Sequence, residues 1–337
     1  MSIQGVITPE RLDDMRTFDL TILEEKITPH LRRLIRQGSI PIGLQFKRQD
    51  FLVEEKFVNV DPLGEETRYS PVKGIIHKFS NRILWKVSYR CAAHCQFCTR
   101  SRQIGGSDGD LSARDIETAL QYISSHKEVD DVILSGGDPF VTPKVTKDII
   151  GRLVQIESVK VIRIGTRLPV HSPSSFKSEP VKHLLSKICS VTKSQPVFVL
   201  LHLNHPDELT VETVEAIRLI QGTGAILMTQ TVFLNDINDS VEVLAKLFIA
   251  VYHLGIIPHY LFHCDKVGGL ERFIVPLEKE REIVTELCKR LSGIAIPRYA
   301  IDVPGKGKID IPLGFWEGVD LTNCSDYEGT TINLVNL

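Results

Sequence analysis

Three cysteines lie within eight residues of one another, at Cys91, Cys95 and Cys98, with the spacing C-x3-C-x2-C. Iron–sulfur clusters normally take four cysteine ligands. Three thiolates can therefore hold three corners of a four-iron–four-sulfur (4Fe-4S) cluster and leave one iron without a protein ligand. Such an iron can chelate the amino and carboxylate groups of S-adenosylmethionine (SAM).

Two other interpretations of these cysteines stay open. A Cys3His zinc site could use His94, although its position next to Cys95 makes a tetrahedron awkward to close. The spacing could also be a coincidence. The remaining cysteines are scattered, which does not fit a disulfide framework, and we expect them to be small buried hydrophobic residues: Cys189, Cys264, Cys288 and Cys324.

Composition excludes several classes of function. The 337 residues are 42% hydrophobic and carry a formal net charge of -2, so neither nucleic acid nor an anionic membrane is expected as the main partner. No apolar run reaches the ~18 residues that a transmembrane helix needs. The first residues have no apolar signal region, and we expect a cytoplasmic protein.

The elements that must position the cysteines alternate along the chain. Short β-rich runs lie at 83–89, 132–138, 160–166, 196–204, 226–233 and 256–263, with a seventh at 294–302. Segments with helical periodicity lie between them, at 113–126, 145–157, 178–190, 210–221, 240–254 and 277–291. Ser112 and Asp115 resemble a capping box at the first of these helices.

This alternation predicts an α/β fold with parallel strands and right-handed crossovers, and the number of units favours a barrel. In such barrels the chemistry lies on loops after the carboxyl ends of strands, where the cysteine loop falls. We expect an N-terminal helical cap or extension at 1–75, a core at 76–312 and a C-terminal tail at 313–337.

Several strings, in order along residues 60–312, resemble the lysine 2,3-aminomutase family of radical SAM enzymes. They are YRCAAHCQFCTRSR, SGGDPF, RIGTRLPVHSP, HLNHPDELT, TQTVFLNDIND, HYLFHCDKVGG and DVPGKGKI. Each string alone is suggestive, and the ordered set is highly specific. The resemblance implies a radical SAM partial (β/α)6 TIM-type barrel, with the 4Fe-4S cluster on the three cysteines.

The resemblance also assigns residues to SAM. Gly136, Gly137 and Asp138, at the end of the second β-run, correspond to the loop that meets the amino end of SAM. An ordinary turn is the alternative. His202, Gln230 and Phe97 match positions around SAM, although a buried histidine and a core aromatic would look the same. Arg167 stands near this rim without an assigned role.

A second cofactor, pyridoxal 5'-phosphate, is implied by the glycine-rich string after Asp302. Lys308 matches the lysine that binds this cofactor as an imine. The string is one residue shorter than is usual in the family, so Lys306 stays an alternative. Arg82 matches a contact to the cofactor phosphate, a group whose geometry suits arginine. Without the resemblance, this lysine loop would read as a solvated basic turn.

The implied substrate is a free amino acid with a cationic tail, lysine in the first place. Arg100 matches the arginine that binds the substrate carboxylate, with Arg102 as a neighbouring candidate. Asp265 and Asp302 match the two carboxylates that bind the distant ammonium group.

The chain also departs from the family. Clostridial-type members hold a structural zinc with one internal cysteine and a C-terminal cysteine group. Here the internal position is Ser240, and the tail has only Cys324. We expect no such zinc, and a homo-oligomer stays open.

The implied reaction is a 2,3-aminomutation, most simply of L-lysine to β-lysine. An external one-electron reductant would start it, and the amino group would move from the α to the β carbon. Arginine as substrate, or supply of β-lysine for modifying elongation factor P, are alternatives within the same chemistry. A non-enzymatic iron–sulfur protein is the alternative from another class.

Overall fold

The computed structural model describes residues 23–48, 61, 63–105, 110–303, 307–311, 324–325 and 331–332. Strands and helices alternate as expected, and the strands form one curved sheet. Seven neighbouring strands run parallel in chain order. They are β2 (Arg82–Ser88), β3 (Asp131–Gly136), β4 (Val161–Thr166), β5 (Val197–His202), β6 (Ile226–Val232), β7 (Ile257–Phe262) and β8 (Arg298–Val303). The prediction of a partial barrel is confirmed.

An antiparallel strand closes each edge of this sheet. β1 (Ile75–Phe79) pairs with β2, and β9 (Gly307–Ile311) pairs with β8. A separate two-stranded sheet joins β10 (Cys324–Ser325) to β11 (Thr331–Ile332). The sequence did not indicate these antiparallel partners, because short strands of mixed polarity give little periodic signal.

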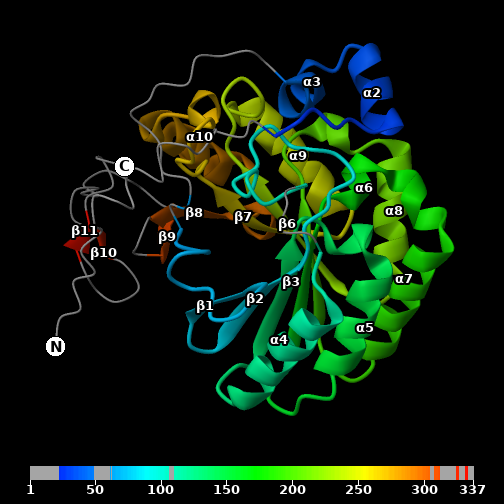
Figure 1. The fold of residues 1–337 in the computed structure, drawn as a ribbon. Coiled ribbons are helices and arrows are strands. Elements are labelled where there is room, and N and C mark those ends of the chain that lie inside the picture. Colours follow the sequence, from blue (N-terminus) through cyan, green and yellow to red (C-terminus); the bar gives the residue numbers. More distant parts are fainter. Residues whose placement is uncertain are drawn as a thin grey trace.

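Helices follow the parallel strands and cover the outer side of the sheet, as Figure 1 shows for α4, α5, α7 and α8. The crossover helices are α4 (Ala113–Ser125), α5 (Pro143–Leu153), α7 (Glu179–Val191), α8 (Val211–Gln221), α9 (Val241–His253) and α10 (Leu277–Arg290). The predicted capping box at Ser112 and Asp115 is confirmed.

Shorter helices complete the described chain. α2 (Pro29–Arg36) and α3 (Ile40–Phe46) precede the sheet, and α6 (Leu168–His171) follows β4 directly. Single 3-10 turns are η2 (Pro139–Val141), η3 (Pro173–Lys177), η4 (Pro206–Glu208), η5 (Glu271–Phe273) and η6 (Gly293–Ala295). Within the described residues, no helix combines the length and apolarity that crossing a bilayer requires.

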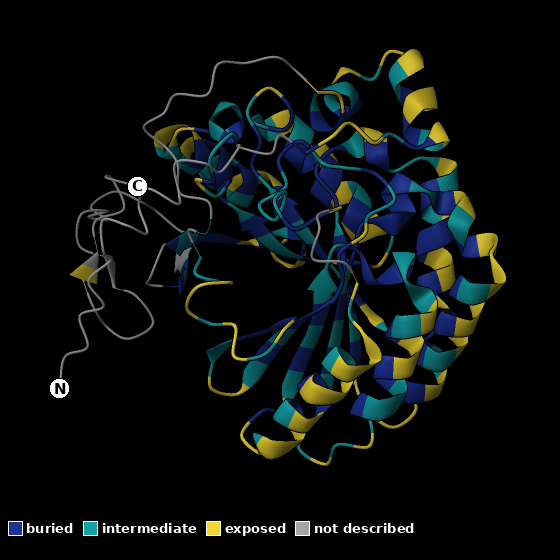
Figure 2. Cartoon of the chain, in the orientation of Figure 1, coloured by how far each residue is buried: buried dark blue, intermediate teal, exposed yellow. Residues whose placement is uncertain are grey.

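The core lies between the sheet and its helices, where buried residues gather in Figure 2. Ile83, Trp85 and Val87 of β2 are buried in this layer. Because side chains alternate along a strand, Arg82 and Lys86 project to the opposite face, inside the curve of the sheet. The inner face of the sheet therefore carries polar residues, whereas the crossover helices pack against the opposite face.

Candidate functional site

The cysteine loop begins where β2 ends and is supported by the N-terminal segment. The backbone N–H of His94 donates to the Lys26 carbonyl at 2.9 Å, and Gln96 donates to the Gln45 carbonyl at 2.8 Å. Lys26 Nζ donates to the Cys91 carbonyl at 2.7 Å. The loop is therefore held from both the sheet and the segment around α2 and α3.

The three thiols of the loop are free and electrostatically close. Burial raises the pKa of Cys98 to about 11, with Cys95 as the next cause. Burial also raises the pKa of Cys91, and Asp138, Cys98 and Cys95 add to that effect. Bare thiolates are thus disfavoured here, whereas bound iron would hold the sulfurs deprotonated.

The donor set fits a cluster better than a single zinc ion. His94 Nδ1 is within 2.8 Å of the Glu24 carbonyl, so this ring is hydrogen-bonded to the N-terminal segment. Among the described residues, no three His, Cys, Asp or Glu side chains converge tightly enough for one metal ion. A cubane places its cysteine ligands on separate irons, and therefore needs a wider arrangement than a tetrahedral zinc.

The other described cysteines differ from expectation in part. Cys264 is buried, as predicted, but Cys189 and Cys288 are only half-buried, so that prediction was wrong for these two. They lie on the crossover helices α7 and α10, where helical periodicity places them at the margin of the core. Ser240 is the N-cap of α9, where its hydroxyl accepts from the Val243 N–H.

The glycine loop packs backbone to backbone against the start of the cysteine loop. Gly136 has φ +111°, and a Cβ there would lie 2.3 Å from the Ser88 carbonyl oxygen. A Cβ on Gly137 would lie 2.4 Å from the Arg90 carbonyl oxygen. The N–H groups of Gly137 and Asp138 donate to these carbonyls at 2.6 and 2.8 Å. Glycine is required here because two backbones approach closely.

Asp138 turns its carboxylate into the protein. It accepts from Thr166 Oγ1 at 2.9 Å and from the N–H groups of Arg167 and Phe140 at 2.8 and 2.9 Å. Burial raises the pKa of this carboxyl group. The side chain therefore ties the glycine loop to the end of β4.

The residues expected around SAM meet beside the cysteine loop. His202 and Gln230 are register partners at the ends of β5 and β6. The Phe97 ring lies 5.7 Å from the His202 ring. Burial and then Arg167 lower the pKa of His202 to about 3, so this histidine is neutral at pH 7. Phe97 also packs in a small apolar cluster with Leu234 and others.

Arg100 projects toward the glycine loop and is paired with Glu65. Its Nε and Nη2 donate to the two Glu65 carboxylate oxygens at 2.8 and 2.7 Å. Its Nη1 donates to Ser135 Oγ at 3.3 Å. Burial opposes the charge of Arg100, but Glu65 raises the arginine's pKa overall. Arg102, the neighbouring candidate, pairs instead with Asp61 and Glu66.

Lys308 and the two predicted aspartates form a second charged group. Asp302 and Lys308 are cross-strand partners of β8 and β9, with 4.0 Å between Lys308 Nζ and Asp302 Oδ2. The ammonium lies 4.2 Å from the centroids of both Tyr260 and Phe262. Burial and then Asp302 raise the pKa of Asp265 to about 7. Lys306 lies outside the described residues.

Arg82 belongs to the same interior. Burial lowers the pKa of Lys308, and Arg82 adds to that effect against the opposing charge of Asp302. The Arg82 guanidinium lies 4.5 Å from the Phe79 ring centroid. Arg163 on β4, paired with Asp131, is its charged neighbour. Arg82 and the Arg163–Asp131 ion pair therefore lie toward the amino ends of β2, β3 and β4.

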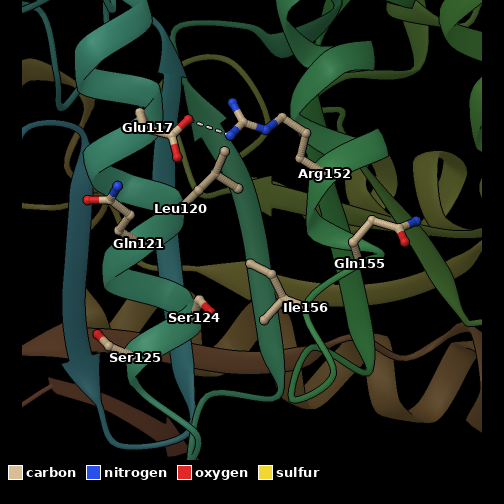
Figure 3. A pocket seen from close by; sticks show the side chains of 8 residues that line it. All are labelled: Glu117, Leu120, Gln121, Ser124, Ser125, Arg152, Gln155 and Ile156. Carbon is tan, nitrogen blue, oxygen red and sulfur yellow. Dashed lines mark hydrogen bonds and ion pairs between the residues drawn. The ribbon is translucent and has the colours of Figure 1, made fainter.

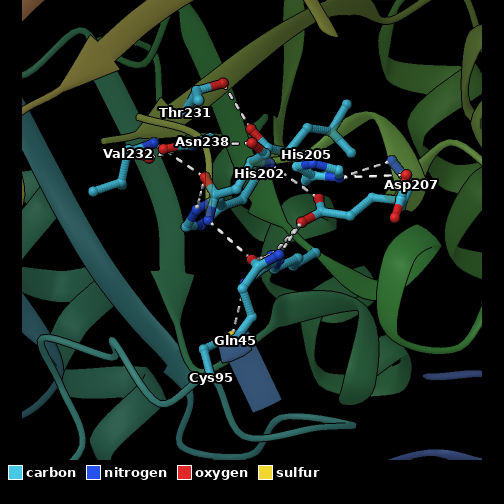
Figure 4. A network of polar contacts seen from close by, with 12 residues as sticks. Gln45, Cys95, His202, His205, Asp207, Thr231, Val232 and Asn238 are labelled. Carbon is cyan, nitrogen blue, oxygen red and sulfur yellow. Dashed lines mark hydrogen bonds and ion pairs between the residues drawn. The ribbon is translucent and has the colours of Figure 1, made fainter. Parts of the chain in front are cut away.

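Glu65, Gln45 and Glu208 support this site and were not predicted from the sequence, and Arg167 was named there without a role. Glu65 could have been suspected only from the acidity of its segment. Arg167 donates to Cys95 Sγ at 3.0 Å and also contacts Gln45 and Glu208. Figure 4 draws the polar network that contains Gln45 and Cys95 and extends to Asn238. Gln45 carries no sequence signal, because a glutamine in a short helix is ordinarily a surface residue.

A surface groove lies elsewhere, between α4 and α5 on the outer side of the sheet. Figure 3 shows the Glu117–Arg152 ion pair that crosses it, with Leu120 and Ile156 along its wall. The residues that line this groove include none of the predicted site residues. Its position on the helical layer separates it from the inner face.

A parallel partial barrel with a three-cysteine loop after its first parallel strand defines the radical SAM class. The family model described as "Radical SAM superfamily" matches residues 85–248.

Among curated relatives, L-lysine 2,3-aminomutase of Clostridium subterminale is 35% identical over 295 residues, covering 85% of this chain and 68% of that protein. The L-lysine 2,3-aminomutase of Fusobacterium nucleatum is 37% identical, covering 86% and 67%. That of Methanococcus maripaludis is 33% identical, covering 94% and 73%. The chain belongs to the lysine 2,3-aminomutase family of radical SAM enzymes, which are isomerases.

Proposed function

We propose that the protein is a 2,3-aminomutase that moves the α-amino group of L-lysine to the β-carbon. The observation that carries the proposal is the pair of carboxylates near Lys308: Asp302 is its cross-strand partner, and Asp265 lies in the loop after β7. Asp265 is coupled electrostatically to Asp302 and Lys308, and it is also among the charges that act on Arg100. A carboxylate-binding arginine and a cation-binding acid pair thus share one interior.

The first part of the proposal concerns the cluster. The radical SAM family implies a 4Fe-4S cluster and SAM. We assign the cluster to Cys91, Cys95 and Cys98, since three half-buried free thiols form the donor set. SAM would lie against the backbone of the loop at 136–138, near Phe97, His202 and Gln230. A neutral His202 can accept or donate a hydrogen bond there without adding positive charge next to the sulfonium.

The second part concerns the amino acid. Glu65 engages the Nε–Nη2 edge of Arg100, while Nη1 points to Ser135 Oγ. The substrate carboxylate would bind at the Nη1 end, and Glu65 would hold the guanidinium plane in place for it. Asp265 and Asp302 would accept from the distant ammonium group. Two converging carboxylates offset the cost of removing that cation from water.

Pyridoxal phosphate fits the group around Lys308. A buried amine whose pKa is lowered is more often neutral, which is the form that bonds to a carbonyl carbon. Arg82 would bind the phosphate, since a guanidinium suits phosphate geometry. When bound, the cluster and SAM supply one-electron chemistry that removes a hydrogen atom, and pyridoxal phosphate supplies a conjugated ring that spreads unpaired spin. The chain positions these groups and excludes water.

We place the enzyme in the cytoplasm, where a one-electron reductant can reach the cluster. The units 1–75, 76–312 and 313–337 remain our proposed division of the chain.

The deciding experiment is anaerobic incubation of the reconstituted full chain with SAM, dithionite and lysine, followed by chromatography for β-lysine. Arginine is tested in parallel. Asp302→Asn should abolish turnover of lysine, whereas Asp148→Asn, at an exposed position on α5, should leave it unchanged. Turnover of another amino acid with lysine inert would refute the substrate, and an absence of any SAM cleavage would refute the reaction.

A further inference from the structure

We propose that Arg167 and Glu208 set the reduction potential of the cluster through a hydrogen bond from Arg167 to the Cys95 sulfur. The inference rests on the proposed role of Cys95 as a cluster ligand. It assigns a positioning role to two buried charges outside the set predicted to bind cofactor or substrate.

The Arg167 guanidinium bridges the cysteine loop and two residues from distant parts of the chain. Nη1 donates to Cys95 Sγ at 3.0 Å. Nη2 donates to Gln45 Oε1 at 2.5 Å and to Glu208 Oε1 at 2.9 Å. Arg167 and Glu208 are 6% and 0% exposed, so this ion pair is shielded from water.

The surroundings hold this geometry in one arrangement. The guanidinium carbon lies 5.0 Å from the Phe46 ring centroid and 5.1 Å from that of Phe97. Glu208 accepts further hydrogen bonds from Gln45 Nε2 at 2.9 Å and from the Asn204 N–H at 3.0 Å. A buried carboxylate with this many donors has little freedom to move away from the arginine.

The network bears on redox chemistry because of where its charges lie. Hydrogen bonds to cluster sulfurs and nearby charges are among the factors that set iron–sulfur potentials. Reduction adds one negative charge to the cluster, which the fixed positive charge of Arg167 stabilises. Glu208 opposes that effect. In a buried region of low effective dielectric, both contributions are larger than they would be in water.

A purely structural role for the same contacts makes a different prediction. Gln45 belongs to α3, and Glu208 to the η4 turn, so the network also joins separate elements. If it served only to join them, removing either charge would loosen the loop, and both substitutions would act in the same direction. An electrostatic role instead requires opposite signs for the two charges.

The test is a redox titration of the anaerobically reconstituted full chain, followed by electron paramagnetic resonance of the reduced cluster. Arg167→Gln should lower the midpoint potential, and Glu208→Gln should raise it. We expect each shift to be about tenfold in the reduction equilibrium constant, which is about 59 mV for one electron. Arg167→Lys keeps the charge and should lie between the wild type and Arg167→Gln.

Arg152→Gln is the matched control, because Arg152 forms an ion pair with Glu117 on the outer helices. Its potential should equal that of the wild type. Shifts of the same sign in Arg167→Gln and Glu208→Gln, or no shift at full iron content, would overturn the inference. If Arg167→Gln fails to fold, the direction of the potential shift in Glu208→Gln decides alone: a higher potential supports the inference, and a lower one refutes it.

Failure of the proposed function would look different. In that case Cys95→Ser would retain a full cluster, or the wild-type chain would assemble none. A cluster that forms through Cys95 but keeps its potential in both charge variants would refute this inference alone.

Discussion

Lysine binding should strengthen about tenfold between about pH 6 and pH 8, because Asp265 must ionise to hold the cationic tail. Burial is the main reason that the pKa of this carboxyl group rises to about 7, and the neighbouring charge of Asp302 is the next. An ordinary aspartate is fully ionised throughout this window. The free enzyme therefore holds Asp265 largely protonated at the lower end of the range.

The magnitude follows from the fraction of enzyme in the competent form. One pH unit below the pKa, about one molecule in eleven has the carboxylate, and one unit above, about ten in eleven have it. The ratio is about ten, and the binding constant levels off once Asp265 is ionised. The same raised pKa favours the protonated carboxyl group in the folded chain. The contribution of Asp265 to the free energy of unfolding is therefore lost as the pH rises from the ordinary aspartate range through about 7.

Isothermal titration calorimetry of the anaerobic enzyme with SAM, but without reductant, measures this binding without turnover. Norleucine is the control ligand, since it shares the α-amino and carboxylate groups and lacks the ammonium. The difference between the two ligands should carry the pH dependence. Asp265→Asn should flatten it, and Asp302→Asn should move its midpoint to lower pH. An equal pH dependence for both ligands, or an unmoved midpoint in Asp302→Asn, would refute the reasoning.

Three further predictions concern other parts of the site. Gly137→Ala should destabilise the fold by about 1 to 3 kcal/mol, because its Cβ would press into backbone; Gly151→Ala, inside α5, should not destabilise it, and thermal melting compares the two. Lys308→Ala should abolish the visible absorbance of bound pyridoxal phosphate while iron content stays unchanged. Retained absorbance would mean that another lysine of the chain binds this cofactor. Glu65→Gln should weaken lysine binding severalfold, since it removes the charge that orients Arg100, and it should move the pH midpoint lower, since Glu65 also raises the pKa of Asp265; calorimetry with unchanged affinity would contradict that role.

The alternation of elements was predictable because its signal is local. The expected run at 226–233 corresponds to β6 at Ile226–Val232, and the helix expected at 277–291 corresponds to α10 at Leu277–Arg290. Periodicity within one segment suffices for such a prediction. The edge strand β1 was not foreseen, because its pairing depends on a register with β2 that no short-range pattern specifies.

The parts of the site likewise divide into local patterns, which the sequence shows, and contacts between distant residues, which it does not. The cysteines are three positions within one loop, so their spacing is visible in the sequence. The contact of Gln45 with Arg167 joins residues 122 apart, and that of Glu208 with Arg167 joins residues 41 apart. Only the packed fold brings these side chains together. The glycines were predicted for their approach to a ligand, whereas the structure also shows them pressed against the cysteine loop itself.

This close packing has a consequence for how the proposed reaction is aligned. Cys98 and Arg100 are two residues apart, and the loop between them turns tightly, with the Ser101 N–H donating to the Cys98 carbonyl at 3.2 Å. Arg100 in turn reaches Ser135, the residue before the glycine pair. The same loop would therefore position both Cys98, a proposed cluster ligand, and Arg100, the proposed partner of the substrate carboxylate. Removal of a hydrogen atom requires reacting atoms in near contact. If the proposed roles hold, a loop shift of even about 1 Å would move Cys98 and Arg100 together, and the spacing between these two residues would change less than their positions.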